Sequence, residues 1–287
     1  MKKLFGLILV LTFAVVLAAC GNGNKSGSDD KKITVGASPA PHAEILEKAK
    51  PLLEKKGYEL DIKTINDYTT PNKLLDKGEI DANYFQHTPY LNTEKKDKGY
   101  KIVSAGDVHL EPMAVYSKKY KSLKELPKGA TVYVSNNPAE QGRFLKFFVD
   151  AGLIKIKKGV KIEDAKFSDI TENKKDIKFN NKQSAEFLPK IYQNEDADAV
   201  IINSNFAIEQ KLNPKKDSIA VESAKDNPYA NLIAVESAKD NPYANLIAVK
   251  EGHQDDKKIK ALIEVLQSKD IQDFINEKYN GAVIPAK

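Results

Sequence analysis

The chain has 287 residues, which is enough for two ordinary domains and a sizeable core. Charged residues make up 30% of it with both signs interspersed, and the formal net charge of +5 falls to +3 without Lys2 and Lys3. Of the 45 basic residues, 44 are lysines spread along the chain, whereas nucleic-acid binders cluster their basic residues and favour arginine. The composition therefore argues against a nucleic-acid partner and favours a solvated surface.

Residues 1–19 have the pattern of a signal peptide. Lys2 and Lys3 precede an apolar stretch at residues 4–17, which is short for a bilayer span, and Leu-Ala-Ala-Cys follows at residues 17–20. This end resembles a bacterial lipobox, which implies cleavage before Cys20 and lipidation of that residue. Residues 20–32 would then form the lipidated cysteine and a flexible tether. An ordinary secretory signal with an incidental cysteine is the alternative.

From Lys31 onward, short β-branched runs alternate with amphipathic segments. Helices with a proline near the start and a glycine near the end are predicted at residues 38–57 and 69–79. Strands are predicted at residues 33–37, 58–65, 80–85 and 101–106. This β-α-β-α order favours a parallel sheet covered by helices.

The same order restarts after residues 109–130, with a strand at 131–135 and a helix at 136–153. That helix has Asn137 as its predicted N-cap, Pro138 at N1 and Glu140 at N3. A helix at 184–196, a strand at 197–202, a helix from 203 onward and one or two amphipathic helices at 255–281 follow. Two α/β lobes result, and the chain must cross between them near residues 110–117. If the last helices pack on the first lobe, the chain crosses back within residues 219–249.

Residues 219–232 (IAVESAKDNPYANL) recur without one change as residues 233–246, and residues 247–249 begin the unit again. Repeat proteins have units of about 20–50 residues, diverge and need at least three copies. The pattern therefore favours a recent in-frame duplication, or an artefact of sequence assembly, over a functional array. We expect one copy to run through the crossover and the surplus 14 residues to loop out. Because 14 is even, a strand that re-enters the sheet keeps its two faces.

The sequence contains no nucleophile elbow, P-loop, dinucleotide-binding glycine pattern or zinc-protease motif. Four scattered histidines are present, and His42 with Glu44 is too small a group to make a metal site. We expect His253 at the surface and His42 at a helix N-terminus. The remaining two are His87 and His109.

Arg143 is the only arginine of the chain. Its predicted helix follows a strand, which places it near the carboxyl edge of a parallel sheet, where open α/β folds bind ligands. A guanidinium can bind a carboxylate through two parallel hydrogen bonds, which lysine cannot do. Arg143 is therefore a candidate carboxylate-binding residue, and an arginine on a helix surface is the simpler alternative.

Other candidates lie at corresponding strand ends. Tyr68 follows one strand, and Phe85 and His87 share a face if their strand extends through both. Asn203 ends a strand of the second lobe, and each copy of NPYAN offers a further asparagine. Core packing for the aromatics and turn formation for the asparagines are the simpler interpretations.

Six segments, taken together and in this order, resemble the methionine-binding lipoproteins of the NlpA/MetQ type, which are solute-binding components of an ABC importer. They are ITVGASPAPHAEIL, NDYTTPNKLLDKGEIDANYFQHTPYL, VHLEPMAVYS, NNPAEQGRFL, AVIINSNFA and NPYANLIAV. The resemblance covers essentially the whole mature chain from about Lys31. It implies an α/β fold of the type II periplasmic-binding-protein kind, with two α/β lobes and a ligand cleft between them.

On this interpretation, residues 33–110 and about 245–287 form lobe 1 and residues 111–218 form lobe 2. Residues 219–249 form the crossover that contains the tandem duplication.

The resemblance also implies roles for single residues. Tyr68 and Phe85 would be aromatic walls for a thioether side chain, with His87 as a polar flank. Arg143 would bind a carboxylate, and Asn203 would meet the polar backbone groups of the ligand.

The asparagine of NPYAN would contribute in the same way, but the family has this segment once. Asn245 is preferred because it runs directly into the final helices, and Asn231 is the alternative.

The function implied is that of a lipid-anchored, monomeric substrate-binding protein on the extracytoplasmic face of the cell membrane. It would capture L-methionine, or a small methionine-containing peptide, and deliver it to an ABC permease and its ATPase, without enzymatic activity, cofactor or metal. The rival interpretation is a metal-ion-binding receptor of the same two-lobe architecture, which requires three or four converging His, Asp or Glu ligands. A surface enzyme with paired carboxylates and a host-facing adhesin are two further alternatives.

Overall fold

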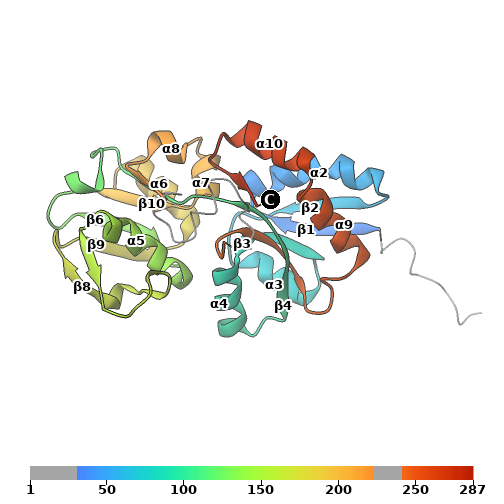
Figure 1. The fold of residues 1–287 in the computed structure, drawn as a ribbon, viewed down its shortest axis with the longest axis horizontal. Coiled ribbons are helices and arrows are strands. Elements are labelled where there is room, and N and C mark those ends of the chain that lie inside the picture. Colours follow the sequence, from blue (N-terminus) through green and yellow to red (C-terminus); the bar gives the residue numbers. More distant parts are fainter. Residues whose placement is uncertain (1–30, 223–240, 287) are drawn as a thin grey trace, which may run out of the picture.

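The alternating segments fold into two α/β lobes that lie side by side (Figure 1). The computed structural model describes residues 31–222 and 241–286. The predicted leader, Cys20 and Asn231 lie outside the described residues. Within the described ranges, no helix combines the length and apolar character needed to cross a bilayer.

Lobe 1 is built on a six-stranded sheet with the order β13-β4-β12-β3-β1-β2. Its strands are β1 (Lys32–Ala37), β2 (Glu59–Thr64), β3 (Ala82–His87), β4 (Ile102–Leu110), β12 (Asn245–Lys250) and β13 (Ile284–Pro285). Its helices are α2 (Glu44–Lys55), α3 (Thr70–Lys77), α4 (Thr88–Lys98), α9 (Lys257–Leu266) and α10 (Lys269–Tyr279). An irregular turn, Pro39–Ala43, precedes α2.

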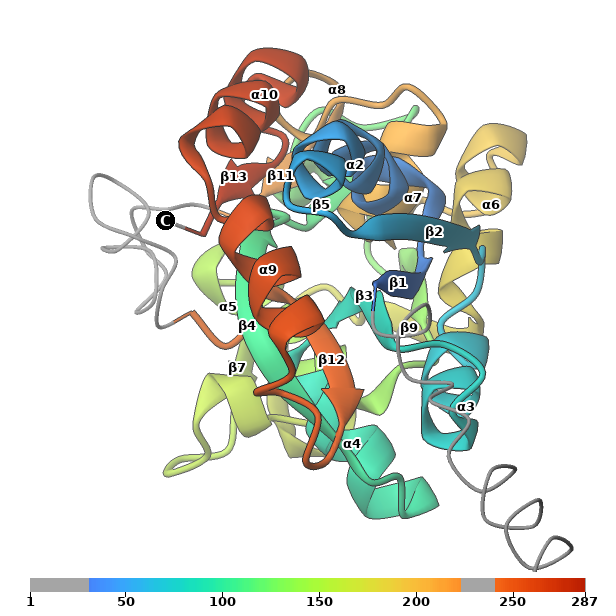
Figure 2. The ribbon, with the colours of Figure 1, turned by 90° about the vertical axis from the view of Figure 1, so that its right-hand side faces the viewer.

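Helices cover both faces of this sheet, as Figure 2 shows. The amphipathic helices α2, α9 and α10 pack on one face, and α3 and α4 pack on the other. Strand β12 alternates between the two cores: Ile247 and Val249 face the first, and Leu246 and Ala248 face the second. Both faces are buried, so residues 246–249 of β12 are all apolar.

The sheet of lobe 1 is mixed: the four strands from which a parallel sheet was predicted, β1 to β4, run in one direction, but β12 does not. Strands β1, β2 and β3 are parallel to one another, whereas β12 lies antiparallel between β3 and β4. The reason is topological. Strand β4 carries the chain toward lobe 2, so the strand that brings the chain back must run in the opposite direction.

Lobe 2 has a five-stranded sheet with the order β11-β5-β10-β6-β9 and a separate β7-β8 pair. The strands are β5 (Ala114–Tyr116), β6 (Thr131–Ser135), β7 (Ile154–Ile156), β8 (Ile170–Asn173), β9 (Lys178–Gln183), β10 (Ala199–Ile202) and β11 (Ala220–Val221). The helices are α5 (Gln141–Asp150), α6 (Leu188–Asn194), α7 (Ser204–Glu209) and α8 (Pro214–Asp217). Ala199 and Ile201 face the core that includes α5, and Val200 and Ile202 face the core under α6 and α7.

The lobes are joined by two crossings of the chain. The first is the short segment of residues 111–113 between β4 and β5. The second begins after β11, where the backbone of Glu222 donates to the carbonyl of Met113 at 2.9 Å. It ends where residues 241–244 lead into β12.

The described residues take the two halves of the crossover from different copies of the duplicated unit. Residues 219–222 of the first copy form and flank β11, and residues 241–246 of the second copy lead into β12. Together they supply one unit except for its SAKD segment. The surplus 14 residues therefore fall within residues 223–240, outside the described ranges.

A variant that lacks residues 223–236 should keep both lobes, because it joins Glu222 to Asn241 through a single SAKD segment. The connection between these two positions shortens from 18 residues to 4, which lowers the entropic cost of closing it by about 1 kcal/mol. Circular dichroism should show an unchanged spectrum, and the melting temperature should rise by about 2–4 °C. A lower melting temperature would contradict this account of the crossover.

Candidate functional site

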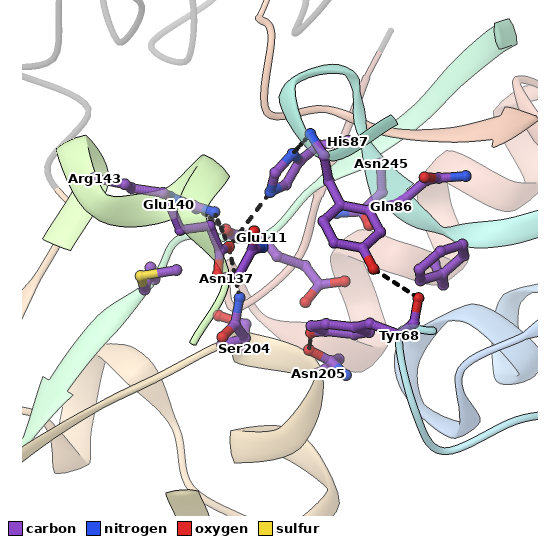
Figure 3. Close-up of a pocket in the computed structure, with 14 residues that line it drawn as sticks. Tyr68, Gln86, His87, Glu111, Asn137, Glu140, Arg143, Ser204, Asn205 and Asn245 are labelled. Carbon is purple, nitrogen blue, oxygen red and sulfur yellow. Dashed lines mark hydrogen bonds and ion pairs between the residues drawn. The ribbon is translucent and has the colours of Figure 1, made fainter. Parts of the chain in front are cut away.

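A cavity lies between the two lobes, at the level of both crossings (Figure 3). Its walls carry both aromatic and polar side chains, as the walls of small-molecule sites commonly do. Fourteen residues line it: Tyr68, Phe85, Gln86, His87, Tyr90, Glu111, Met113, Asn137, Glu140, Arg143, Asn203, Ser204, Asn205 and Asn245.

All six described residues that the sequence singled out lie in this lining: Tyr68, Phe85, His87, Arg143, Asn203 and Asn245. They come from both lobes and from the second copy of the duplicated unit. Strand β3 runs through His87, so Phe85 and His87 share a face of it, as the prediction required.

One wall of the cavity is aromatic. The ring of Tyr68 lies 5.9 Å from that of Phe85 and 6.1 Å from that of Tyr90, measured between centroids. The Tyr68 hydroxyl donates to Oδ1 of Asn205 at 2.6 Å, and the Tyr90 hydroxyl donates to the carbonyl of Tyr68 at 2.8 Å. Because Tyr68 follows β2 and Asn205 lies in α7, the first of these bonds joins the two lobes.

Glu140 is the most deeply buried acid of the cavity, with 1% of its surface exposed. Nδ1 of His87 accepts from the backbone of Tyr90, so the ring proton lies on Nε2 and is donated to Oε1 of Glu140 at 3.3 Å. Nδ2 of Asn203 donates to the same oxygen at 2.8 Å. Burial alone would raise the pKa of Glu140, but the bond with His87 and the charge of Arg143 lower it below its usual value.

The capping pattern at Asn137 and Glu140 predicted only part of the local structure. Asn137 is indeed an N-cap, and its Oδ1 accepts from the backbone of Ala139 at 3.0 Å. Instead of one continuous helix, however, a 3-10 turn at Pro138–Glu140 precedes α5. The Glu140 side chain leaves the helix end and reaches into the cavity, because His87 and Asn203 lie there.

Arg143 is 8% exposed, and its guanidinium is held by several partners. Nε and Nη2 bind the two carboxylate oxygens of Glu222 at 2.5 and 2.6 Å, and Nη2 also donates to the carbonyl of Glu111 at 2.8 Å. The ring of Tyr243 lies 4.8 Å from its central carbon. Burial lowers the pKa of Arg143, but the facing charge of Glu222 outweighs burial and raises the pKa above its usual value.

Behind the cavity, His42, His109 and Glu111 form a buried cluster. Nε2 of His109 lies 2.8 Å from Oε1 of Glu111, and Nδ1 of His109 is hydrogen-bonded to the hydroxyl of Tyr84. Nε2 of His42 lies 3.0 Å from Oδ1 of Asn245 and 3.3 Å from Glu111. The bond from His42 occupies Oδ1 of Asn245 and leaves the Nδ2 donor for the cavity.

The expectation of His42 at a helix N-terminus holds in part, since it lies in the turn before α2, but its ring is fully enclosed. Three such side chains are the kind of group that the metal-receptor alternative requires. Nε2 of His109 and Oε1 of Glu111 are 2.8 Å apart, which is the length of a direct hydrogen bond. The cluster is thus a hydrogen-bonded network that orients Asn245 and Glu111.

Burial lowers the pKa of His42 to about 4 and that of His109 to about 3, and it raises the pKa of Glu111. Both histidines are therefore neutral in the folded protein near pH 7. Of the three acids around the site, Glu111 and Glu222 were missed because no local pattern marks them, and Glu140 was given only a place at the start of a helix. A proline directly after Glu111, at a predicted crossing between lobes, was the one available signal.

The sequence model of the NlpA lipoprotein family matches residues 33–240 and again 234–287. The methionine-binding lipoprotein MetQ of Bacillus subtilis is 53% identical over 286 residues, which cover 99% of both chains. The D-methionine-binding lipoprotein MetQ of Salmonella typhi is 36% identical and covers 98% of this chain and 97% of its own.

Solved structures agree with these matches. The crystal structure of a lipoprotein from Bacillus subtilis has a TM-score of 0.82 with 52% identity, and it covers 90% of this chain and 99% of its own. A nutrient-binding protein of Burkholderia cenocepacia, solved bound to methionine, has a TM-score of 0.79 with 38% identity, and it covers 89% and 100%.

The buried histidines predict a loss of stability in acid. The unfolded chain binds a proton at each histidine near pH 6.5, whereas folded His42 resists protonation down to about pH 4. The free energy of unfolding should therefore fall as the pH falls between these values, by on the order of 3 kcal/mol for His42. His42→Gln should flatten the fall in melting temperature between pH 6.5 and 4.

The matched control is His253→Gln, because His253 is exposed and pairs with Asp256 at the surface. This variant should keep the parent's pH dependence. If the melting temperature of His42→Gln fell as steeply with pH as that of the parent, the neutral buried ring would not be the cause of the loss of stability in acid.

Proposed function

The chain belongs to the NlpA lipoprotein family, and on that premise we propose that it binds L-methionine between its lobes as the substrate-binding protein of an ABC importer. The observation that carries this proposal is the cavity itself. It combines the chain's single guanidinium with an aromatic wall, and both lobes contribute to it. The methionine-bound Burkholderia cenocepacia structure supports the choice of ligand.

The polar end of an amino acid fits the donors and acceptors of the cavity. Both N–H groups of Arg143 Nη1 remain for the carboxylate, since Nε and Nη2 bind Glu222 and Glu111. Nδ2 of Asn245 is a second donor. Oδ1 of Asn203 accepts no hydrogen bond from the described residues, so it can accept one from the ammonium group. Charge-assisted bonds of this kind contribute about 1.5–3 kcal/mol each.

The apolar end fits the opposite wall. Tyr68, Phe85 and Tyr90 surround the space in which a side chain would lie. Thioether sulfur gains about 0.3–1.5 kcal/mol from contact with aromatic rings beyond the burial itself. A ligand that touches both lobes stabilises the closed arrangement, and a permease can sense that arrangement. This role requires no covalent bond to be made or broken.

The leader fits the same role. Removal of residues 1–19 and lipidation of Cys20 would hold a monomeric receptor at the extracytoplasmic face of the cell membrane, within reach of the permease and its ATPase. Free methionine is our first choice of substrate, and a small methionine-containing peptide is the alternative. Titration calorimetry with L-methionine, glycyl-methionine and leucine distinguishes them, and no heat from either methionine ligand would refute the proposal.

Arg143→Ala should weaken methionine binding by at least tenfold in a chain that stays folded, with a lower melting temperature because Glu222 loses its partner. The loss follows from removing the cation that faces the carboxylate. Lys146→Ala is the matched control, because it removes a cation from the same helix, where Lys146 pairs with Asp150 at the surface. Unchanged affinity in Arg143→Ala would remove this residue from the site.

The two copies of NPYAN provide a second matched pair. Asn245→Ala should weaken methionine binding about tenfold, because it removes a donor of the cavity and the partner of His42. Asn231→Ala, in an identical local sequence, should bind as the parent does. The reverse result, or an effect of the double variant alone, would contradict the assignment of Asn245.

A further inference from the structure

Arg143 does not direct its usual two-donor edge toward the cavity. Nε and Nη2 form that edge, and the carboxylate of Glu222 occupies it at 2.5 and 2.6 Å. The second N–H of Nη2 donates to the carbonyl of Glu111 at 2.8 Å. A guanidinium has five N–H donors, so the two on Nη1 are those left for a ligand.

Glu222 is itself held from two sides. Its Oε2 accepts from the backbone of Met113 at 2.7 Å, and its backbone donates to the carbonyl of Met113 at 2.9 Å. Strand β11, which it follows, is antiparallel to β5. The carboxylate is thus fixed to the first crossing of the chain, and Arg143 is fixed through it.

The second copy of the duplicated unit holds the guanidinium from another direction. The ring of Tyr243 lies 4.8 Å from the central carbon of Arg143 and 5.3 Å from the ring of His87. Glu222 belongs to the first copy and Tyr243 to the second. Both copies therefore contribute to the surroundings of the one arginine.

Without Glu222, Arg143 has a competing acid close by. Oε1 of Glu140 lies 3.6 Å from Nη1, beyond an ordinary hydrogen bond. A guanidinium freed from Glu222 would turn its two-donor edge to Glu140 and fill the space that a ligand carboxylate needs. The ion pair with Glu222 prevents this rotation.

We infer that Glu222 is the positioning residue of the ligand site: it holds Arg143 so that Nη1 alone faces the cavity and receives the ligand's carboxylate. This inference rests on the proposed function. It also assigns a role to the second crossing, because the residue that fixes the arginine lies where the chain begins to leave lobe 2.

The test compares Glu222→Gln with Glu236→Gln, its counterpart in an identical local sequence of the other copy. The neutral amide has one acceptor oxygen and no charge, so it cannot form the two parallel N–H···O bonds that the carboxylate makes with the guanidinium. Glu222→Gln should therefore weaken L-methionine binding at least fivefold, as should the double variant, and Glu236→Gln should bind as the parent does. L-Methioninamide lacks the carboxylate, so the affinity for this ligand should differ from that of the parent by less than twofold in all three variants.

A second arm separates positioning from a general structural role. In an Arg143→Ala background, Glu222→Gln should change methionine affinity less than twofold, because its effect passes through the missing guanidinium. Glu222→Asp keeps the charge but is too short for both bonds, so it should give an intermediate loss. Glu222→Asp also replaces Glu222→Gln in the test if the glutamine variant does not fold.

Three results would overturn the inference. Parent-like methionine binding by both Glu222→Gln and the double variant is the first, and equal losses for methionine and methioninamide are the second. The third is a loss that persists in the Arg143→Ala background. Failure of the parent to bind methionine would instead refute the proposed function, so the two failures are distinguishable.

Discussion

The balance of buried charge around Arg143 is the constraint on which the site depends. One guanidinium shares an enclosed space with Glu222, Glu140 and Glu111, and a buried charge without a partner costs several kcal/mol. Each acid has such a partner: Glu222 has the guanidinium, Glu140 has His87 and Asn203, and Glu111 has His109. The acids outnumber the cation, so a simple carboxylate would meet net repulsion. A zwitterion adds no net charge, and its ammonium group can face the acids while its carboxylate faces the guanidinium.

The same polar groups hold the two lobes together. The bond from Tyr68 to Asn205 and the bond from His87 to Glu140 each join an element of lobe 1 to an element of lobe 2. The residues that make these two bonds all line the cavity. Opening the lobes would separate Glu140 from His87, and closing around a ligand adds bonds on both sides. A ligand shifts such an equilibrium only by its different affinity for the two states, and contacts from both lobes provide that difference.

The sequence predicted what local patterns encode. Helix and strand periodicity indicated two α/β lobes, and residues at strand ends, such as Tyr68 and Asn203, line the cavity because neighbouring strand ends meet there. The antiparallel β12 and the acids around Arg143 were not predictable in this way. Glu140 follows Asn137 as a capping residue does, and only the fold brings His87 within 3.3 Å of it. Contacts between residues far apart in the chain decided these cases.

The duplication is compatible with the fold because of where the flanks of the unit are tied. At its start, the backbone of Ile219 donates to Val115 and that of Glu222 to Met113, which fixes the first copy to β5. At its end, Asn245 to Lys250 lie between β3 and β4, and Glu251 donates to Lys101 just before the chain turns toward α9. Threading one copy through both places would put 14 extra residues before β11 or after β12, where these bonds leave no room. Dividing the unit between its copies places the extra residues between Glu222 and Asn241 in the chain, after β11 and before β12, and interrupts neither strand.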